Sequence, residues 1–161
     1  MMIHKLASFV KFDDSQKFMN QNQVNRHWVR YLCDTNNLIM VKKINWDDVP
    51  VEQVTPKMQR QLIYGDKVMV ARMKFKAGFL VPLHSHINEQ VTHVTSGTIR
   101  FWFGENKEQV MDLHAGDVVV IPENVPHEAL MVTDVEETDT WAPIREDWLD
   151  GTDNYLRQNE E

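Results

Sequence analysis

Three histidines and one glutamine have the residue types and the spacing of ligands for a single metal ion. His84 and His86 are two positions apart in a segment predicted to be extended, and alternate residues of a strand face the same side of a sheet. Gln90 begins the next predicted strand, and His127 follows Pro126 near the start of a later one. Because imidazole and amide groups suit several divalent ions, we predict that these four side chains bind one ion of zinc, nickel, iron or manganese.

The register of the strand predicted over 90–96 decides whether Gln90 or Glu89 faces the same side as His84 and His86. Gln90 follows Glu89 directly, and a shift of one residue moves a side chain to the opposite face of a sheet. A strand over 90–96 favours Gln90, although a β-bulge would bring Glu89 to the same side. A neutral Gln90 leaves the charge of the metal uncompensated, which favours Lewis-acid chemistry on an anionic or hydroxylated substrate. It also departs from the two-histidine, one-carboxylate pattern of iron oxygenases.

A second group of reactive side chains lies near the C-terminal end of the chain. Asp139 and Trp141 share a face if their segment is a strand, and Arg145 follows Pro143, which ends strand pairing. A guanidinium can hold a carboxylate through two hydrogen bonds, and an aspartate near a dication can transfer a proton. We therefore predict Asp139 as an acid/base residue and Arg145 as a substrate ligand. The alternative is an exposed ion pair at the end of a strand.

Short runs of β-branched and aromatic residues alternate with turn residues over most of the chain. They predict strands at 60–64, 67–76, 79–86, 90–96, 98–103, 108–113, 118–121 and 128–132. Many short strands without intervening helices indicate an antiparallel sandwich or barrel. We expect one β domain over 44–148 and an N-terminal extension over 1–43 with a helix in it, which either packs on the domain or on a second subunit or is a partly ordered arm. The end of the chain from Arg145 is acidic and polar and forms a short helix or a tail, with the polar C-terminal tail placed over 149–161.

Two of these segments resemble the motifs of the cupin family. Residues 78–97 resemble the first cupin motif, and residues 116–127 resemble the second. The resemblance implies an all-β, single-domain cupin, a double-stranded β-helix or jelly-roll barrel. Residues 138–149 further resemble the end of small KdgF-type cupins, which share the His-x-His-x-x-x-Gln pattern and open and ketonise unsaturated uronate sugars. Matched by position, the metal ligands of that group fall on His84, His86, Gln90 and His127, its acid/base residue on Asp139 and its substrate-binding guanidinium on Arg145.

The KdgF-type resemblance favours one function over three alternatives. It implies a redox-neutral lyase or isomerase acting on a small carboxylated or sugar-acid substrate, in a pocket altered by Trp141, which stands where the group has Phe. A metal-dependent dioxygenase is favoured instead if Glu89 is a ligand. A non-enzymatic metal or small-molecule sensor is the third interpretation. The chain resembles the cupin lyases of dimethylsulfoniopropionate less, since they carry Glu at position 90 and a Tyr near position 92, where this chain has Gln90 and Thr92.

Composition limits the class of partner. The 161 residues carry a net charge of -7, which disfavours nucleic acid, and no apolar run has the length of a membrane span. Cys33 is the only cysteine, so no internal disulfide forms, and with no signal-peptide pattern we expect a cytoplasmic protein. The apolar run Leu38 to Val41 needs a partner strand, so we also expect a homodimer.

Overall fold

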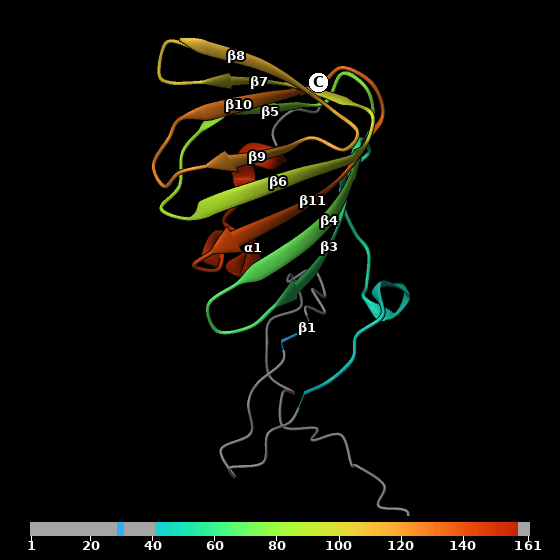
Figure 1. Ribbon diagram of the computed structural model, residues 1–161. Helices are drawn as coiled ribbons and strands as arrows, with labels where there is room; N and C mark the ends of the chain where they lie inside the picture. Colours follow the sequence, from blue (N-terminus) through green and yellow to red (C-terminus); the bar gives the residue numbers. More distant parts are fainter. Residues whose placement is uncertain (1–28, 31–40, 158–161) are drawn as a thin grey trace, which may run out of the picture.

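The computed structural model describes residues 29–30 and 41–157, which form two β-sheets with three short helical segments (Figure 1). The larger sheet has the order β1-β3-β4-β11-β6-β9, and β2 pairs with β3. Its strands are β1 (Val29–Arg30), β2 (Glu52–Thr55), β3 (Met58–Tyr64), β4 (Met69–Phe75), β6 (Glu89–Ser96), β9 (Val118–Ile121) and β11 (Val135–Ala142).

The smaller sheet has the order β5-β10-β7-β8. Its strands are β5 (Leu80–His84), β7 (Thr98–Phe103), β8 (Gln109–His114) and β10 (His127–Met131). All strand pairs are antiparallel except β1 with β3. The helical segments are η1 (Trp46–Asp48), α1 (Glu146–Asp150) and η2 (Asn154–Leu156). The predicted all-β fold is confirmed.

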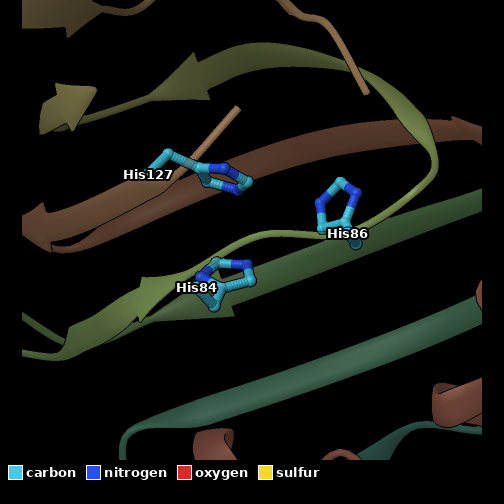
Figure 2. A group of neighbouring side chains, drawn as sticks. All are labelled: His84, His86 and His127. Carbon is cyan, nitrogen blue, oxygen red and sulfur yellow. The ribbon is translucent and has the colours of Figure 1, made fainter. Parts of the chain in front are cut away.

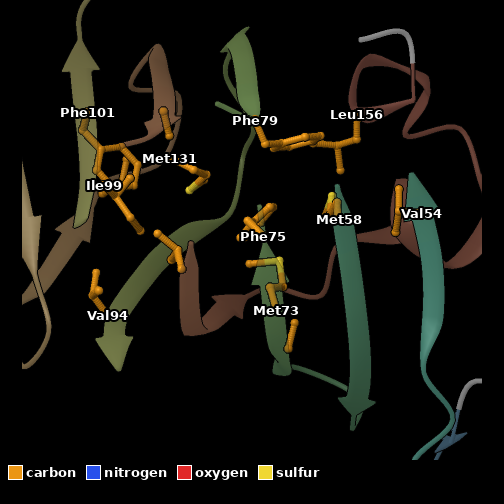
Figure 3. Close-up of a cluster of buried hydrophobic side chains, with 14 of the residues drawn as sticks. Val54, Met58, Met73, Phe75, Phe79, Val94, Ile99, Phe101, Met131 and Leu156 are labelled. Carbon is orange, nitrogen blue, oxygen red and sulfur yellow. The ribbon is translucent and has the colours of Figure 1, made fainter. Parts of the chain in front are cut away.

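Alternation along the strands places one hydrophobic core between the two sheets. In β11, for example, every second residue from Val135 to Trp141 is buried, as expected for a strand with one face on a core. Figure 3 shows apolar side chains of both sheets in a single cluster. Burial of each large apolar side chain contributes about 1.5–3 kcal/mol, so this shared core holds the sheets together and fixes the strand ends that carry the site. The cluster includes Met58, Leu62, Phe75, Ile99, Phe101, Met131 and Trp141.

Several predicted strands agree closely with the structure. The predictions for 98–103 and 118–121 coincide with β7 and β9. The turn before β7 needs Gly97, whose φ is +88° and where a Cβ atom would collide with the backbone carbonyl of Asp134. Strand β2 was not predicted. No helix among the described residues is long and apolar enough to cross a membrane.

The two ends of the chain differ from expectation where the structure describes them. At the C-terminal end the short-helix alternative holds for α1, which crosses the expected boundary at 148/149, and Asp153 and Leu156 of the following segment are buried. In the N-terminal extension, Val29–Arg30 is strand β1 rather than helix. The remainder of the proposed helix, and Leu38 to Met40 of the apolar run, lie outside the described residues.

Candidate metal centre

Two neighbouring strands bring the three predicted histidine ligands together. His84 ends β5, His86 follows in the next loop, and His127 begins β10. Strands β5 and β10 pair antiparallel with His127 directly opposite His84. One ligand atom from each ring lies within 4.8 Å of the others, and Figure 2 shows the three rings gathered around one space.

Backbone hydrogen bonds fix the same tautomer in all three rings. In each ring the Nδ1 atom lies 2.8 or 2.9 Å from a backbone carbonyl oxygen two residues away. Because a carbonyl only accepts, Nδ1 carries the hydrogen and Nε2 is left with a free lone pair. The carbonyls that accept these bonds belong to Pro82, Asn88 and Val125. This arrangement, in which a second ring nitrogen is anchored by the protein, is typical of histidines that bind metals.

Burial keeps these rings uncharged. It lowers the pKa of His84 to about 3, with a further contribution from the nearby ring of His127. Burial likewise lowers the pKa of His127 to about 4 and lowers that of His86. Since only a neutral imidazole binds a metal, the pocket maintains the three rings in the form that coordination requires.

Gln90 points into the same space in a fixed orientation. Its side-chain oxygen accepts a hydrogen bond from the Trp141 indole at 2.8 Å, and an indole nitrogen can only donate. The Gln90 nitrogen then donates to Asp139 Oδ2 and to Thr92 Oγ1, both at 2.9 Å. Glu89 is exposed on the other face of β6, so the strand carries Gln90 inward without a bulge at this point.

The contact between His86 and Gln90 indicates what the centre can hold. His86 Nε2 lies 3.0 Å from Gln90 Oε1, and its Nδ1 lies 2.9 Å from the carbonyl of Asn88. Both neighbours are acceptors, whereas a neutral imidazole has one N–H to donate, and burial opposes the doubly protonated ring. A cation shared by His86 Nε2 and Gln90 Oε1 satisfies both atoms. The donor set of three Nε2 atoms and one amide oxygen therefore fits a divalent metal ion.

Two buried carboxyl groups extend the site along β11. Asp139 and Glu137 face the interior and are 2% and 5% exposed. Burial raises the pKa of Asp139 to about 7, and burial together with the Asp139 charge raises that of Glu137. Within the described structure, Asp139 Oδ1 and Glu137 Oε2 have no hydrogen-bond partner. These two oxygens are free to accept a hydrogen bond from a ligand or a water molecule.

Arg145 is buried and forms an ion pair with the carboxylate of Asp147. Its guanidinium donates to Asp147 through Nε at 2.9 Å and Nη2 at 2.6 Å, and Nη2 also donates to the Tyr155 hydroxyl at 3.0 Å. Arg145 and Asp139 are 3% and 2% exposed, and the guanidinium pairs with Asp147 rather than with Asp139. The alternative of an exposed ion pair between Asp139 and Arg145 is therefore wrong.

A small cavity joins the two predicted groups. Its volume is about 40 Å³, and its lining includes His84, Gln90, His127, Asp139 and Arg145. Its remaining walls are mostly apolar and include Met58, Met73, Phe75, Phe101 and Met131. The structure thus brings together, around one cavity, residues predicted separately from two distant parts of the sequence.

Three residues of the site were missed in the sequence. Tyr155 lies in the segment expected to be a tail, and nothing in its flanking residues distinguishes it. Glu137 has the same strand parity as Asp139, which was a usable signal. Asn88 donates from Nδ2 to the carbonyls of Pro143 and Ile144 at 2.7 and 3.0 Å. It thereby ties the His86 loop to the loop that carries Arg145.

Comparisons with known proteins agree with this architecture. The family model described as the cupin domain matches residues 71–137. An RmlC-like cupin from Shewanella frigidimarina is 26% identical with a TM-score of 0.58, and the match covers 63% of this chain and 90% of that one. KdgF from Halomonas sp. is 25% identical with a TM-score of 0.58, over 63% of this chain and 94% of that one.

A more distant match shows the fold alone. The oxalate decarboxylase of Bacillus subtilis, which has Mn(II) centres, is 16% identical with a TM-score of 0.59, over 67% of this chain and 32% of that one. No curated protein matches the chain. With its two-sheet jelly-roll barrel and three histidines placed to hold a metal ion, the described part of the chain has the fold of a small single-domain cupin and is similar to KdgF.

Proposed function

We propose that this cupin is a metal-dependent lyase or isomerase that catalyses redox-neutral proton transfer on a small carboxylated hydroxy acid or sugar acid. The observation that carries the proposal is the placement of Asp139. This buried carboxyl accepts a hydrogen bond from Gln90 and shares a cavity with His84 and Arg145. The similarity to KdgF supports the same class of reaction.

Each group has a separate role in this proposal. A divalent ion held by the three histidines and Gln90 supplies Lewis acidity when bound. The raised pKa of Asp139, caused by burial, suits a group that takes up and releases a proton near neutral pH. Arg145 binds the substrate carboxylate in place of Asp147, and the apolar walls exclude water from the proton-transfer path.

The proton transfer balances without an oxidant. In the conversion of an enol to a ketone, the enol O–H bond breaks and a C–H bond forms at the adjacent carbon. The C=C bond becomes a single bond as the C–O bond becomes C=O, so no electrons leave the substrate. Asp139 takes the proton from oxygen and returns a proton to carbon. This chemistry separates the proposal from the dioxygenase alternative, which consumes oxygen.

The test follows turnover with and without oxygen. Metal-loaded protein is incubated with unsaturated uronates and with short enol-forming hydroxy acids, and loss of the conjugated ultraviolet absorbance is recorded. We expect the same rate in air and under argon. Oxygen uptake stoichiometric with turnover assigns the protein to the dioxygenases, and absence of turnover on both substrate groups removes the proposed reaction.

Variants of the two proposed catalytic residues refine the test. Asp139→Asn should abolish turnover and retain the metal, because it removes the proton carrier and keeps the shape of the side chain. Arg145→Ala should mainly raise KM, since it removes binding of the carboxylate. The matched control is Asp112→Asn, which makes the same chemical change at an exposed residue. Undiminished turnover by Asp139→Asn would exclude Asp139 as the acid/base.

A further inference from the structure

Glu137 is a buried acidic residue to which neither the fold nor the proposed reaction assigns a role. It lies on β11 opposite Met73 of β4 and Val94 of β6 and is 5% exposed. It lines the same cavity as His84 and Asp139, and its Oε2 atom has no hydrogen-bond partner within the described structure. Because a buried carboxyl without a partner is costly, a compensating group is expected beside it.

Asp139 shows the same feature two residues further along the strand. Its Oδ1 atom also lacks a hydrogen-bond partner among the described residues, and alternate Cα atoms on one face of a strand are about 7 Å apart. Burial and then the Asp139 charge raise the pKa of Glu137, which indicates two like charges at close range. Arg145 lines the cavity but forms its ion pair with Asp147. When ionised, the two carboxyls therefore bring two negative charges that this guanidinium, already paired, does not balance.

The metal-ligand candidates leave the opposite imbalance. Mainly through burial, the pKa values of His84 and His127 are about 3 and about 4, and burial also lowers the pKa of His86. The rings are therefore neutral and the Gln90 amide carries no charge, so a divalent ion bound by the four side chains keeps its two positive charges. Gln90 donates a hydrogen bond to Asp139 at 2.9 Å, so the ligand set and the carboxyl pair are in contact.

We propose that Glu137, together with Asp139, balances the charge of the metal ion from within the cavity without binding the ion. The positive charge of the ion favours the ionised form of both carboxyls. At an effective dielectric constant of about 20, charges still interact over about 10 Å, so Glu137 needs no contact with the ion to stabilise it. Because the ligands themselves stay neutral, the ion keeps its Lewis acidity. Glu137 acts through the ion and is thus a positioning residue.

The affinity of the metal-free protein for Zn²⁺ and for Mn²⁺, measured by competition with a chelator, tests this assignment. Glu137→Gln keeps the shape of the side chain and removes its charge, so we expect the Kd of both ions to rise at least about tenfold. Glu137→Asp keeps the charge and should stay within about threefold of the wild type. Asp139 also carries the proton in the proposed reaction, so variants of Glu137 isolate the effect of charge.

Two controls separate charge from folding. Glu136→Gln makes the same chemical change at the neighbouring position, on the outer face of β11, where Glu136 pairs with Lys74, and it should leave both Kd values unchanged. Glu137→Leu should weaken metal binding and yet stabilise the metal-free fold against urea, because it removes an unpaired buried carboxyl. These opposite signs exclude unfolding as the cause of weaker binding.

Three results would overturn the inference. The first is a wild-type Kd for both ions in Glu137→Gln. The second is an equal loss of affinity in Glu137→Asp and Glu137→Gln, which would make shape rather than charge the cause. The third is a loss confined to Mn²⁺, an ion that carboxylate ligands favour, which would make Glu137 a direct ligand. None of these measurements requires turnover, so the proposed reaction stands or fails separately.

Discussion

Acid should destabilise the metal-free wild-type protein more than it destabilises metal-free His84→Gln. The imidazole of His84 has a pKa of about 3 in the folded chain, held low mainly by burial and then by the His127 ring. In the unfolded chain its pKa is about 6.5. The unfolded state therefore binds more protons between these values, so the free energy of unfolding falls as the pH drops below about 6.5 and stops falling near the folded value.

The size of the effect follows from the two pKa values. At about pH 5 the unfolded imidazole is about 1.5 units below its pKa and the folded imidazole is still neutral, and each unit corresponds to about 1.4 kcal/mol. At about pH 7.5 both states are neutral and the contribution is close to zero. The difference in unfolding free energy between wild type and His84→Gln should therefore change by about 2 kcal/mol across this interval.

Urea denaturation of chelator-treated protein at the two pH values measures this difference. The buried carboxyls of Asp139 and Glu137 have raised pKa values, so their protonation stabilises the fold as the pH falls, opposite in sign to the histidine effect. Both carboxyls are present in both proteins, and their contribution cancels. His93→Gln, at an exposed position of β6, is the matched control. A wild-type–His84→Gln difference that does not vary with pH would refute the buried, neutral state of His84.

Four further substitutions test the surroundings of the centre. Gln90→Glu should retain the metal and bind it more tightly, because a carboxylate adds negative charge to the site. Glu89→Ala should leave the metal content unchanged. Loss of the metal from Glu89→Ala would show that Glu89, and not Gln90, is the ligand. Asp153→Asn should lower the free energy of unfolding by about 3 kcal/mol, because it removes one buried partner of Arg60. A decrease of less than about 1 kcal/mol would show that the Arg60–Asp153 pair does not anchor the segment after α1. Glu137→Leu should raise the free energy of unfolding of the metal-free protein by about 1–3 kcal/mol by removing an unsatisfied buried carboxyl, and a decrease would reveal a partner for it.

Local patterns in the sequence were sufficient for most of the strands after β2 and for the parity of Gln90. The strand over 98–103 is bounded by glycines that allow tight turns, and the alternation in 90–96 carries Gln90 inward and Glu89 outward. These features depend on neighbours in the chain, which the sequence displays directly. Strand pairing places His127 opposite His84, but the strand predicted over 79–86 ends at His84, so the loop after β5, and not strand alternation, brings His86 to the site.

Contacts between distant segments were not predictable in this way. Asp153 resembles a solvated residue of a polar tail, yet its partner Arg60 lies in β3, and the pair is buried only because the segment after α1 folds back on the barrel. Tyr155 reaches His84 for the same reason. Arg145 pairs with Asp147, which is only two residues away, rather than with Asp139, and this local choice depends on the turn into α1, which no pattern in the sequence specifies.

Elemental analysis of the purified protein tests the central claim, that the three histidines hold a metal ion, most directly. The wild type should contain about one divalent ion per chain, and His84→Ala, His86→Ala and His127→Ala should each lose most of it while remaining folded. His114→Ala, at an exposed histidine outside the cluster, should retain the wild-type content. Wild-type metal content in the three cluster variants would contradict the assignment.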